Sequence, residues 1–134
     1  MCRLTSHEMI KGSTQMSSID RPMHGDVLLF DLGHERRLTT DQDRIERSGR
    51  NARTLLKEDA LRVTLIVVGA GGEIPEHQAS GPIVVQVLEG AIAFTAAGVT
   101  HDLAAGHLLS LKAGIRHSVR SAAGGTFLLT VCQV

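Results

Sequence analysis

The stretch IVVQVLEGAIAF, residues 83–94, decides the fold class of this chain. β-Branched and other apolar residues fill it, which is typical of a strand with buried side chains. Gly90 interrupts the run at a point where a long strand could bend or form a bulge. The run LRVTLIVV at 61–68 has the same character. The centre of the chain therefore predicts extended strands.

Shorter strand-like runs, separated by glycine-containing turns, surround this centre. They are VLLFDL (27–32), RTLLK (53–57), HDL (101–103), LLSLKAG (108–114) and TFLLTVC (126–132). The polar segment 34–47 differs, because its Leu38 and Ile45 share one helical face, and it predicts a turn or a short helix. No long amphipathic helix separates the later runs, so we expect an all-β protein built as an antiparallel sandwich or barrel.

Length, composition and charge limit the kinds of partner. The 134 residues, of 14.3 kDa, suit one domain with a hydrophobic core of its own. Fourteen basic residues balance fourteen acidic ones, so no overall field attracts nucleic acid or anionic lipid. The chain also has no Trp or Tyr on which bases could stack. We therefore expect neither a nucleic-acid partner nor a membrane partner.

The two cysteines, Cys2 and Cys132, lie near opposite ends of the chain. Residues 1–20 are polar and contain neither a signal peptide nor a membrane-spanning run. Two cysteines without a secretory signal predict free thiols in a reducing compartment, and hence a cytoplasmic protein. We expect Cys132, on the last strand, to be buried and inert, and residues 1–25 to form a flexible N-terminal segment.

Glycines and histidines of the second half follow two spaced patterns. The first contains Gly71, His77 and Gly90, and the second contains Gly106, Gly114 and His117. In this the chain resembles the cupin superfamily, whose motifs read G-x5-H-x-H-x(3–4)-E-x6-G and G-x5-P-x-G-x2-H-x3-N. The resemblance implies a cupin-type double-stranded β-helix, the RmlC-like jelly-roll barrel. It would form a single domain over residues 26–134, with the motif-bearing core at 60–134.

The same resemblance implies a pocket inside the barrel. Complete cupins hold a divalent metal with three histidines and a glutamate, and here His77 matches the first histidine and His117 the last. The second histidine is replaced by Ala79 and the glutamate by Ile83. Half of the ligand set is thus missing, including its only negative member, which makes the pocket mostly apolar. We expect His77, His117, Ala79 and Ile83 to line a binding site for a small molecule.

Replacements for the missing ligands are scarce. Glu76 and Gln78 flank His77 and would point to the opposite face of a strand. His101 lies two residues before the apolar Leu103, so it would share the inward face and could serve as a third ligand. Two or three histidines could still hold zinc, nickel, iron or copper, although most stable sites use three protein ligands or more.

Three functions remain open at this point. The chain could be a binding module whose two histidines orient the polar end of a ligand. It could be a metal-dependent enzyme, because the resemblance includes dioxygenases and isomerases. It could also have a structural role, with the histidines left as hydrogen-bonded residues of an apolar barrel. Exposed strand edges and the habit of similar small cupins predict a homodimer.

Overall fold

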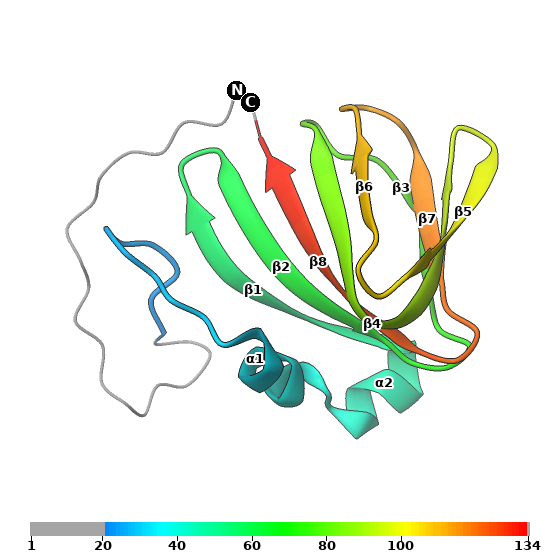
Figure 1. Cartoon of the computed structure of the whole chain (residues 1–134), viewed down its shortest axis with the longest axis horizontal. Coiled ribbons are helices and arrows are strands. Elements are labelled where there is room, and N and C mark those ends of the chain that lie inside the picture. Colours follow the sequence, from blue (N-terminus) through cyan, green and yellow to red (C-terminus); the bar gives the residue numbers. More distant parts are fainter. Residues whose placement is uncertain (1–20, 134) are drawn as a thin grey trace.

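The computed structural model describes residues 21–133 and contains two short helices followed by eight strands (Figure 1). The helices are α1 (Leu32–Thr39) and α2 (Gln42–Ser48). The strands are β1 (Arg50–Glu58), β2 (Leu61–Val68), β3 (Glu73–His77), β4 (Ile83–Ala96), β5 (Val99–Ala104), β6 (Leu108–Leu111), β7 (His117–Arg120) and β8 (Gly125–Cys132).

All strand pairs are antiparallel, and the long strand β4 belongs to both halves of the barrel. The main path runs β1-β2-β8-β4-β7-β3. Residues 83–90 of β4 pair with β8, and residues 83–86 also pair with β6, whereas residues 91–96 pair with β5. A register shift between Val87 and Glu89 precedes Gly90, whose φ is +70°. The strand bends there, as the sequence predicted, and the sheet curls (Figure 1).

The core lies between the two halves of this curled sheet. Along the first part of β4, Ile83, Val85 and Val87 are buried, and the alternating positions face away. They join Phe94 and Phe127, which are 1% and 2% exposed, in one hydrophobic cluster. This alternation is the expected signature of strands with one face on the core, and the all-β jelly-roll prediction is confirmed.

The helices lie against the end of the barrel where β1 begins and β2 ends (Figure 1). Asp31 caps α1 by accepting a hydrogen bond from the backbone N–H of His34. The Asn51 side chain donates to the carbonyl oxygen of Thr39 at 2.8 Å, and Arg53 forms a 2.8 Å ion pair with Glu35. Both contacts tie α1 to β1. The short helix predicted near 34–47 is thus confirmed, as two helices.

Three details of the predicted strands need correction. Residues 27–32 do not form a strand: Val27 and Leu29 are 69% and 94% exposed in an irregular segment, and α1 begins at Leu32. The strands β3 and β7 were not predicted, because each is short. β3 also contains Pro75, which fits an edge strand, since proline has no N–H for a ladder hydrogen bond.

The cysteine prediction is partly wrong. Cys132 is buried, as expected, but it is disulfide-bonded and so is not a free thiol. Cys2 lies outside the described residues, as does most of the predicted flexible segment 1–25. The cytoplasmic location therefore loses one of its supports and stays a prediction. Within residues 21–133, no helix is long and apolar enough to cross a membrane.

Candidate functional site

Two imidazoles from different parts of the chain meet inside the barrel. His77 ends β3 and His117 begins β7, and the two residues are paired across the antiparallel ladder. Their ring centroids are 4.3 Å apart in an edge-to-face arrangement. His117 is 4% exposed, whereas His77 is exposed. A register irregularity between Ile74 and His77 accompanies this pairing, and such bulges often redirect a side chain near a site.

Backbone carbonyls favour one tautomer of each ring. The Nδ1 atom of His77 lies 2.9 Å from the carbonyl oxygen of Pro75, and that of His117 lies 2.9 Å from the carbonyl oxygen of Ile115. A carbonyl oxygen only accepts, so each Nδ1 must donate. In the neutral ring the proton is then on Nδ1, and Nε2 carries a free lone pair. Each imidazole thus offers an acceptor or a metal-ligating atom.

Burial keeps His117 neutral. Loss of water around the ring lowers the pKa of His117 below its ordinary value, and the hydrogen bond to Ile115 and the neighbouring His77 have smaller, opposed effects. Phe94 stacks on the His117 ring with centroids 5.3 Å apart and an interplanar angle of 13°. This apolar face excludes water from one side of the ring. His117 is therefore a fixed, uncharged acceptor.

A small apolar cavity lies beside the two rings. Its volume is about 60 Å³, and apart from the two histidines its walls are aliphatic or aromatic. These walls are Ile66, Ile74, Val85, Phe94, Val119, Phe127 and Leu129. The cavity could take a small apolar group next to the imidazoles, because such sites are lined mainly by apolar side chains with few polar groups.

A second, larger cavity of about 450 Å³ includes all four residues that the sequence placed in the pocket. His77, His117, Ala79 and Ile83 line it together. Ala79 and Ile83 present only apolar surface where a complete cupin motif has a histidine and a glutamate. The structure thus brings the predicted residues to one cavity, and the two histidines lie where it meets the smaller one.

Sequence reasoning missed several residues of the larger cavity. Arg62 and Thr64 come from β2, Leu129 and Val131 from β8, and Gln133 follows β8. The signal for Arg62 was available, because alternation along β2 from the buried core residue Ile66 turns residues 64 and 62 to the same interior face.

The loop after β3 adds two polar groups, Gln78 and Ser80. We expected Gln78 to face away from His77, but β3 ends at His77, so strand alternation does not apply and Gln78 lines the cavity. Glu76, on the other side of His77, does stay outside the cavity, in an exposed 2.7 Å ion pair with Arg116. The pair joins the residues directly before His77 and His117.

Neither the proposed third ligand, His101, nor the last position of the second motif, Ser121, lies at the two cavities. His101 is exposed on β5 and lines neither cavity. Ser121, at the position of the motif asparagine, is 1% exposed; its hydroxyl donates to the carbonyl oxygen of Ala91 and accepts from the N–H of Gly124. Within residues 21–133, no three His, Cys, Asp or Glu side chains are grouped so as to hold a metal ion.

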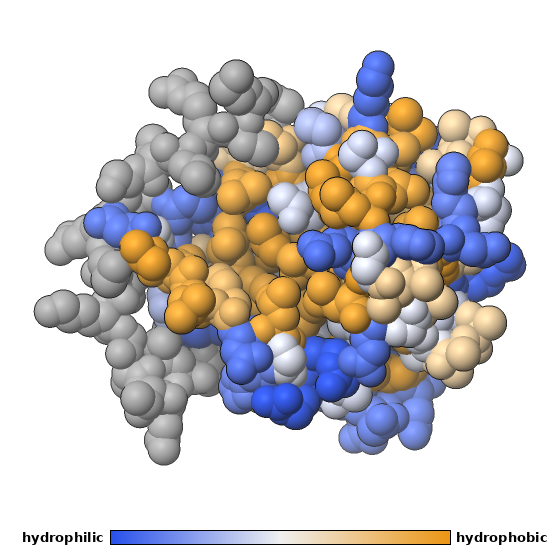
Figure 2. Space-filling view, viewed as in Figure 1, coloured by the Kyte–Doolittle hydropathy of each residue, from blue (hydrophilic) through white to orange (hydrophobic). Residues whose placement is uncertain are grey.

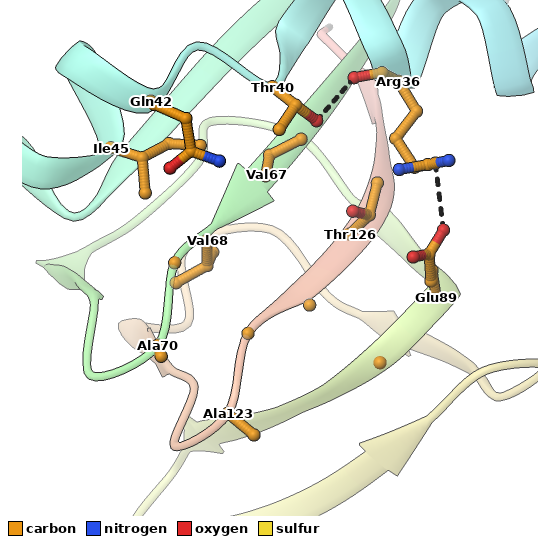
Figure 3. Close-up of a pocket in the computed structure, with 14 residues that line it drawn as sticks. Arg36, Thr40, Gln42, Ile45, Val67, Val68, Ala70, Glu89, Ala123 and Thr126 are labelled. Atoms are coloured by element: carbon orange, nitrogen blue, oxygen red, sulfur yellow. Dashed lines mark hydrogen bonds and ion pairs between the residues drawn. The ribbon is translucent and has the colours of Figure 1, made fainter.

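A third hollow, of about 460 Å³, lies at the opposite end of β2 and β8, between the helices and the turns (Figure 3). Arg36 crosses its edge and forms a 2.9 Å ion pair with Glu89, and the Thr40 hydroxyl donates to the Arg36 carbonyl oxygen. The charged groups of this hollow thus neutralise each other. Nothing in it selects a ligand, so the candidate site is the one at the histidines.

The geometry agrees with the comparison to known families. The family model described as "Cupin domain" matches residues 64–132, which is more than half of the chain. The chain therefore belongs to the cupin family. The matched region contains both histidines, the six strands β3 to β8 and most of β2. No curated protein gives a significant match.

Solved structures support the same fold. A conserved protein of unknown function from Streptococcus pyogenes has 27% identity and a TM-score of 0.61, with 66% of this chain and 77% of that chain covered. An RmlC-like cupin from Shewanella frigidimarina has 23% identity and a TM-score of 0.62, covering 65% and 78%. Salicylate 1,2-dioxygenase from Pseudoaminobacter salicylatoxidans has 20% identity and a TM-score of 0.69, covering 77% of this chain but 32% of that enzyme.

Proposed function

We propose that this cupin barrel binds a small molecule in its mostly apolar pocket, with His77 and His117 orienting the polar end of the ligand. One observation carries the proposal: both imidazoles donate through Nδ1 to a backbone carbonyl, so both keep an Nε2 lone pair, and both residues line the shared cavity. Aliphatic and aromatic walls surround them. A few fixed polar groups in an apolar cavity are the usual composition of a small-molecule site.

The lone pairs restrict the ligand chemistry. A neutral imidazole whose Nδ1 is already used can only accept at Nε2. The matching ligand group is therefore a donor, such as a hydroxyl, an amine or an amide N–H. A carboxylate would find no donor on two neutral rings of this tautomer.

Imidazole NMR tests the proposal directly. In ¹⁵N-labelled protein above pH 7 we expect the Nδ1–H form at both rings. Millimolar 1,6-hexanediol, a neutral donor on an apolar chain, should shift the Nε2 resonances of both histidines. Loss of one hydrogen bond in His77→Ala or His117→Gln should weaken its binding by about 2- to 10-fold.

The control is His34→Ala, which removes an exposed histidine of α1 far from the cavity and should leave binding unchanged. Nε2–H forms at both rings, or hexanediol binding that neither cavity variant weakens, would contradict the proposal. The latter result would leave the histidines with a purely structural role.

The alternative is a metal-dependent enzyme with a reduced two-histidine or three-histidine site, dioxygenase-like or isomerase-like. The Nδ1 hydrogen bonds favour it, because metal-ligating histidines are commonly oriented in this way. The similarity to salicylate 1,2-dioxygenase is consistent with it at the level of the fold. The donor set, however, does not fit a complete resident site for zinc, nickel, iron or copper: two neutral nitrogens supply no charge, and His101 is not at the cavity.

Elemental analysis separates the two functions. We expect untagged protein to contain less than about 0.1 equivalents of transition metal after dialysis, because two neutral imidazoles form too few bonds to retain it. Near-stoichiometric metal that disappears in His77→Ala would instead establish the enzyme alternative. The His34→Ala variant serves again as the control for adventitious binding to a surface histidine.

We further propose that the chain forms a homodimer through the exposed segment before α1. Leu29 is 94% exposed and Val27 is 69% exposed. The edge strand β1 lies near the start of this segment, because the Lys57 N–H donates to the carbonyl oxygen of Met23. Exposed edges and apolar side chains favour pairing with a second copy. Figure 2 shows that apolar residues also spread over the middle of this view of the molecule, across β2, β8 and β4.

Light scattering tests the dimer. At tens of micromolar we expect a dimer mass, and Leu29→Asp should weaken dimerisation by at least about 10-fold, since a charge would have to be buried at the interface. Val99→Asp changes a 54% exposed residue of β5 and is the matched control. A monomer mass for the unmodified protein, or an equal effect of the two substitutions, would refute this interface.

A further inference from the structure

The larger cavity is lined by a positive charge and by no negative charge. Of the residues that line it, Arg62 is the one with a permanent charge, and none is acidic. The other polar side chains, Thr64, Gln78, Ser80 and Gln133, are neutral. A cavity with one cation and low-dielectric walls favours an anion, because the field of the charge is less screened there than in bulk water.

Arg62 differs from three other arginines near the barrel, which form ion pairs. Arg36 is paired with Glu89, Arg53 with Glu35, and Arg116 with Glu76. Among residues 21–133, no carboxylate forms an ion pair with Arg62. Its guanidinium is therefore available to a group from outside the chain.

The neighbour of Arg62 adds to the positive charge. In the β1–β2 ladder Arg62 is directly opposite Lys57, so the two side chains project from the same face of the sheet. Like charges in this arrangement destabilise a sheet, and neither residue has a described acidic partner. A bound anion would reduce this repulsion, which is consistent with a binding role for Arg62.

The cavity thus has two kinds of polar group. Arg62, near the start of β2, attracts an anion, whereas His77 and His117 accept from a donor. Ile83 and Val131 add apolar surface to the same cavity, and Val131 pairs with Arg62 across the β2–β8 ladder. The small cavity of about 60 Å³ adjoins the histidines. A ligand that satisfies both ends must carry an anion and a donor on one apolar body.

We propose that the pocket selects small organic acids that also carry a hydroxyl or amine, with the carboxylate at Arg62 and the donor at the Nε2 atoms of His117 and His77. This assignment rests on the proposed binding function and specifies its ligand class. Arg62 determines the preference for charge, and the histidines determine the preference for a donor. A planar guanidinium also suits the two oxygens of a carboxylate.

Three matched probes separate these preferences: 6-hydroxyhexanoate has both groups, 1,6-hexanediol lacks the carboxylate, and hexanoate lacks the hydroxyl. By calorimetry at low salt, we expect 6-hydroxyhexanoate to bind about 5- to 10-fold more tightly than either other probe. Arg62→Gln should bring the affinities of the hydroxy acid and the diol within about 2-fold of each other. Arg37→Gln removes the same charge from an exposed position on α1 and should keep the full preference.

The outcomes distinguish this inference from the proposed function. If the diol binds as tightly as the hydroxy acid, or if Arg62→Gln and Arg37→Gln have equal effects, the acid preference is refuted while the histidine pocket stands. If hexanoate binds as tightly as 6-hydroxyhexanoate, the donor role of the histidines is refuted. If no probe binds, both proposals fail. Arg62→Lys, which keeps the charge but loses the planar geometry, should retain part of the preference.

Discussion

Phe94→Ala is expected to lower the free energy of unfolding by about 3–5 kcal/mol, as is usual when a large side chain is removed from a packed core. Phe94 is 1% exposed, belongs to the main hydrophobic cluster and lines the small cavity beside the histidines. Removing its ring enlarges that cavity, and partial collapse of the surrounding strands recovers little of the loss. Urea or guanidinium unfolding measures the change.

The same ring also sets the state of His117. Phe94 stacks on the imidazole, and burial is the main cause of the lowered pKa of His117. The milder Phe94→Leu variant should therefore raise that pKa toward its ordinary value. Phe127→Leu is the matched control, because Phe127 is equally buried and lines the same cavity, but has no ring contact with either histidine. An NMR titration in which both variants move the pKa of His117 equally would contradict the stacking argument.

Much of the fold could be predicted because the long strands have a clear compositional signal in the sequence. β2 and β4 are long runs rich in β-branched and other apolar residues, many of them buried, and Gly90 marks the bend between the two halves of β4. Residues 27–32 have a similar composition but form no strand: residues 27–31 are irregular, with Leu29 exposed, and Leu32 begins α1. A short apolar run forms a strand only where a neighbouring strand supplies hydrogen bonds, and local composition does not contain that information.

The site was predictable only in part, because motif spacing identified the two histidines but not the other residues of the cavity. Motif spacing placed His77 and His117 in one barrel, and the ladder between β3 and β7 pairs them. Arg62 is outside both motifs, and its place at the cavity depends on β2 lying beside β8, a pairing between distant segments. The Nδ1 contacts with Pro75 and Ile115 depend on local backbone geometry at the ends of two short strands, which spacing does not define.

Gly90→Ala is expected to destabilise the protein by about 2–5 kcal/mol. Gly90 has a φ of +70°, a conformation that costs an L-residue with a Cβ about 1–2 kcal/mol. An added Cβ would also lie 2.9 Å from the Cα of Gly125 and still closer to the carbonyl oxygen of Gly124. Both atoms are backbone, so β4 and β8 would have to move apart, at a further cost of about 1–3 kcal/mol.

Gly98→Ala separates the two contributions. Gly98, in the turn between β4 and β5, has a φ of +77°, but an added Cβ would meet nothing within 4 Å. It should lose about 1–2 kcal/mol, the cost of the backbone conformation alone. The difference between the two variants then measures the crowding of β4 against the turn before β8. Because β4 is shared by both halves of the barrel, Gly90→Ala should also disturb the imidazole resonances of His117, which pairs with Ala96 on the same strand. Equal losses for Gly90→Ala and Gly98→Ala would show that the strands separate freely at this point and that the bend does not hold the two halves in register.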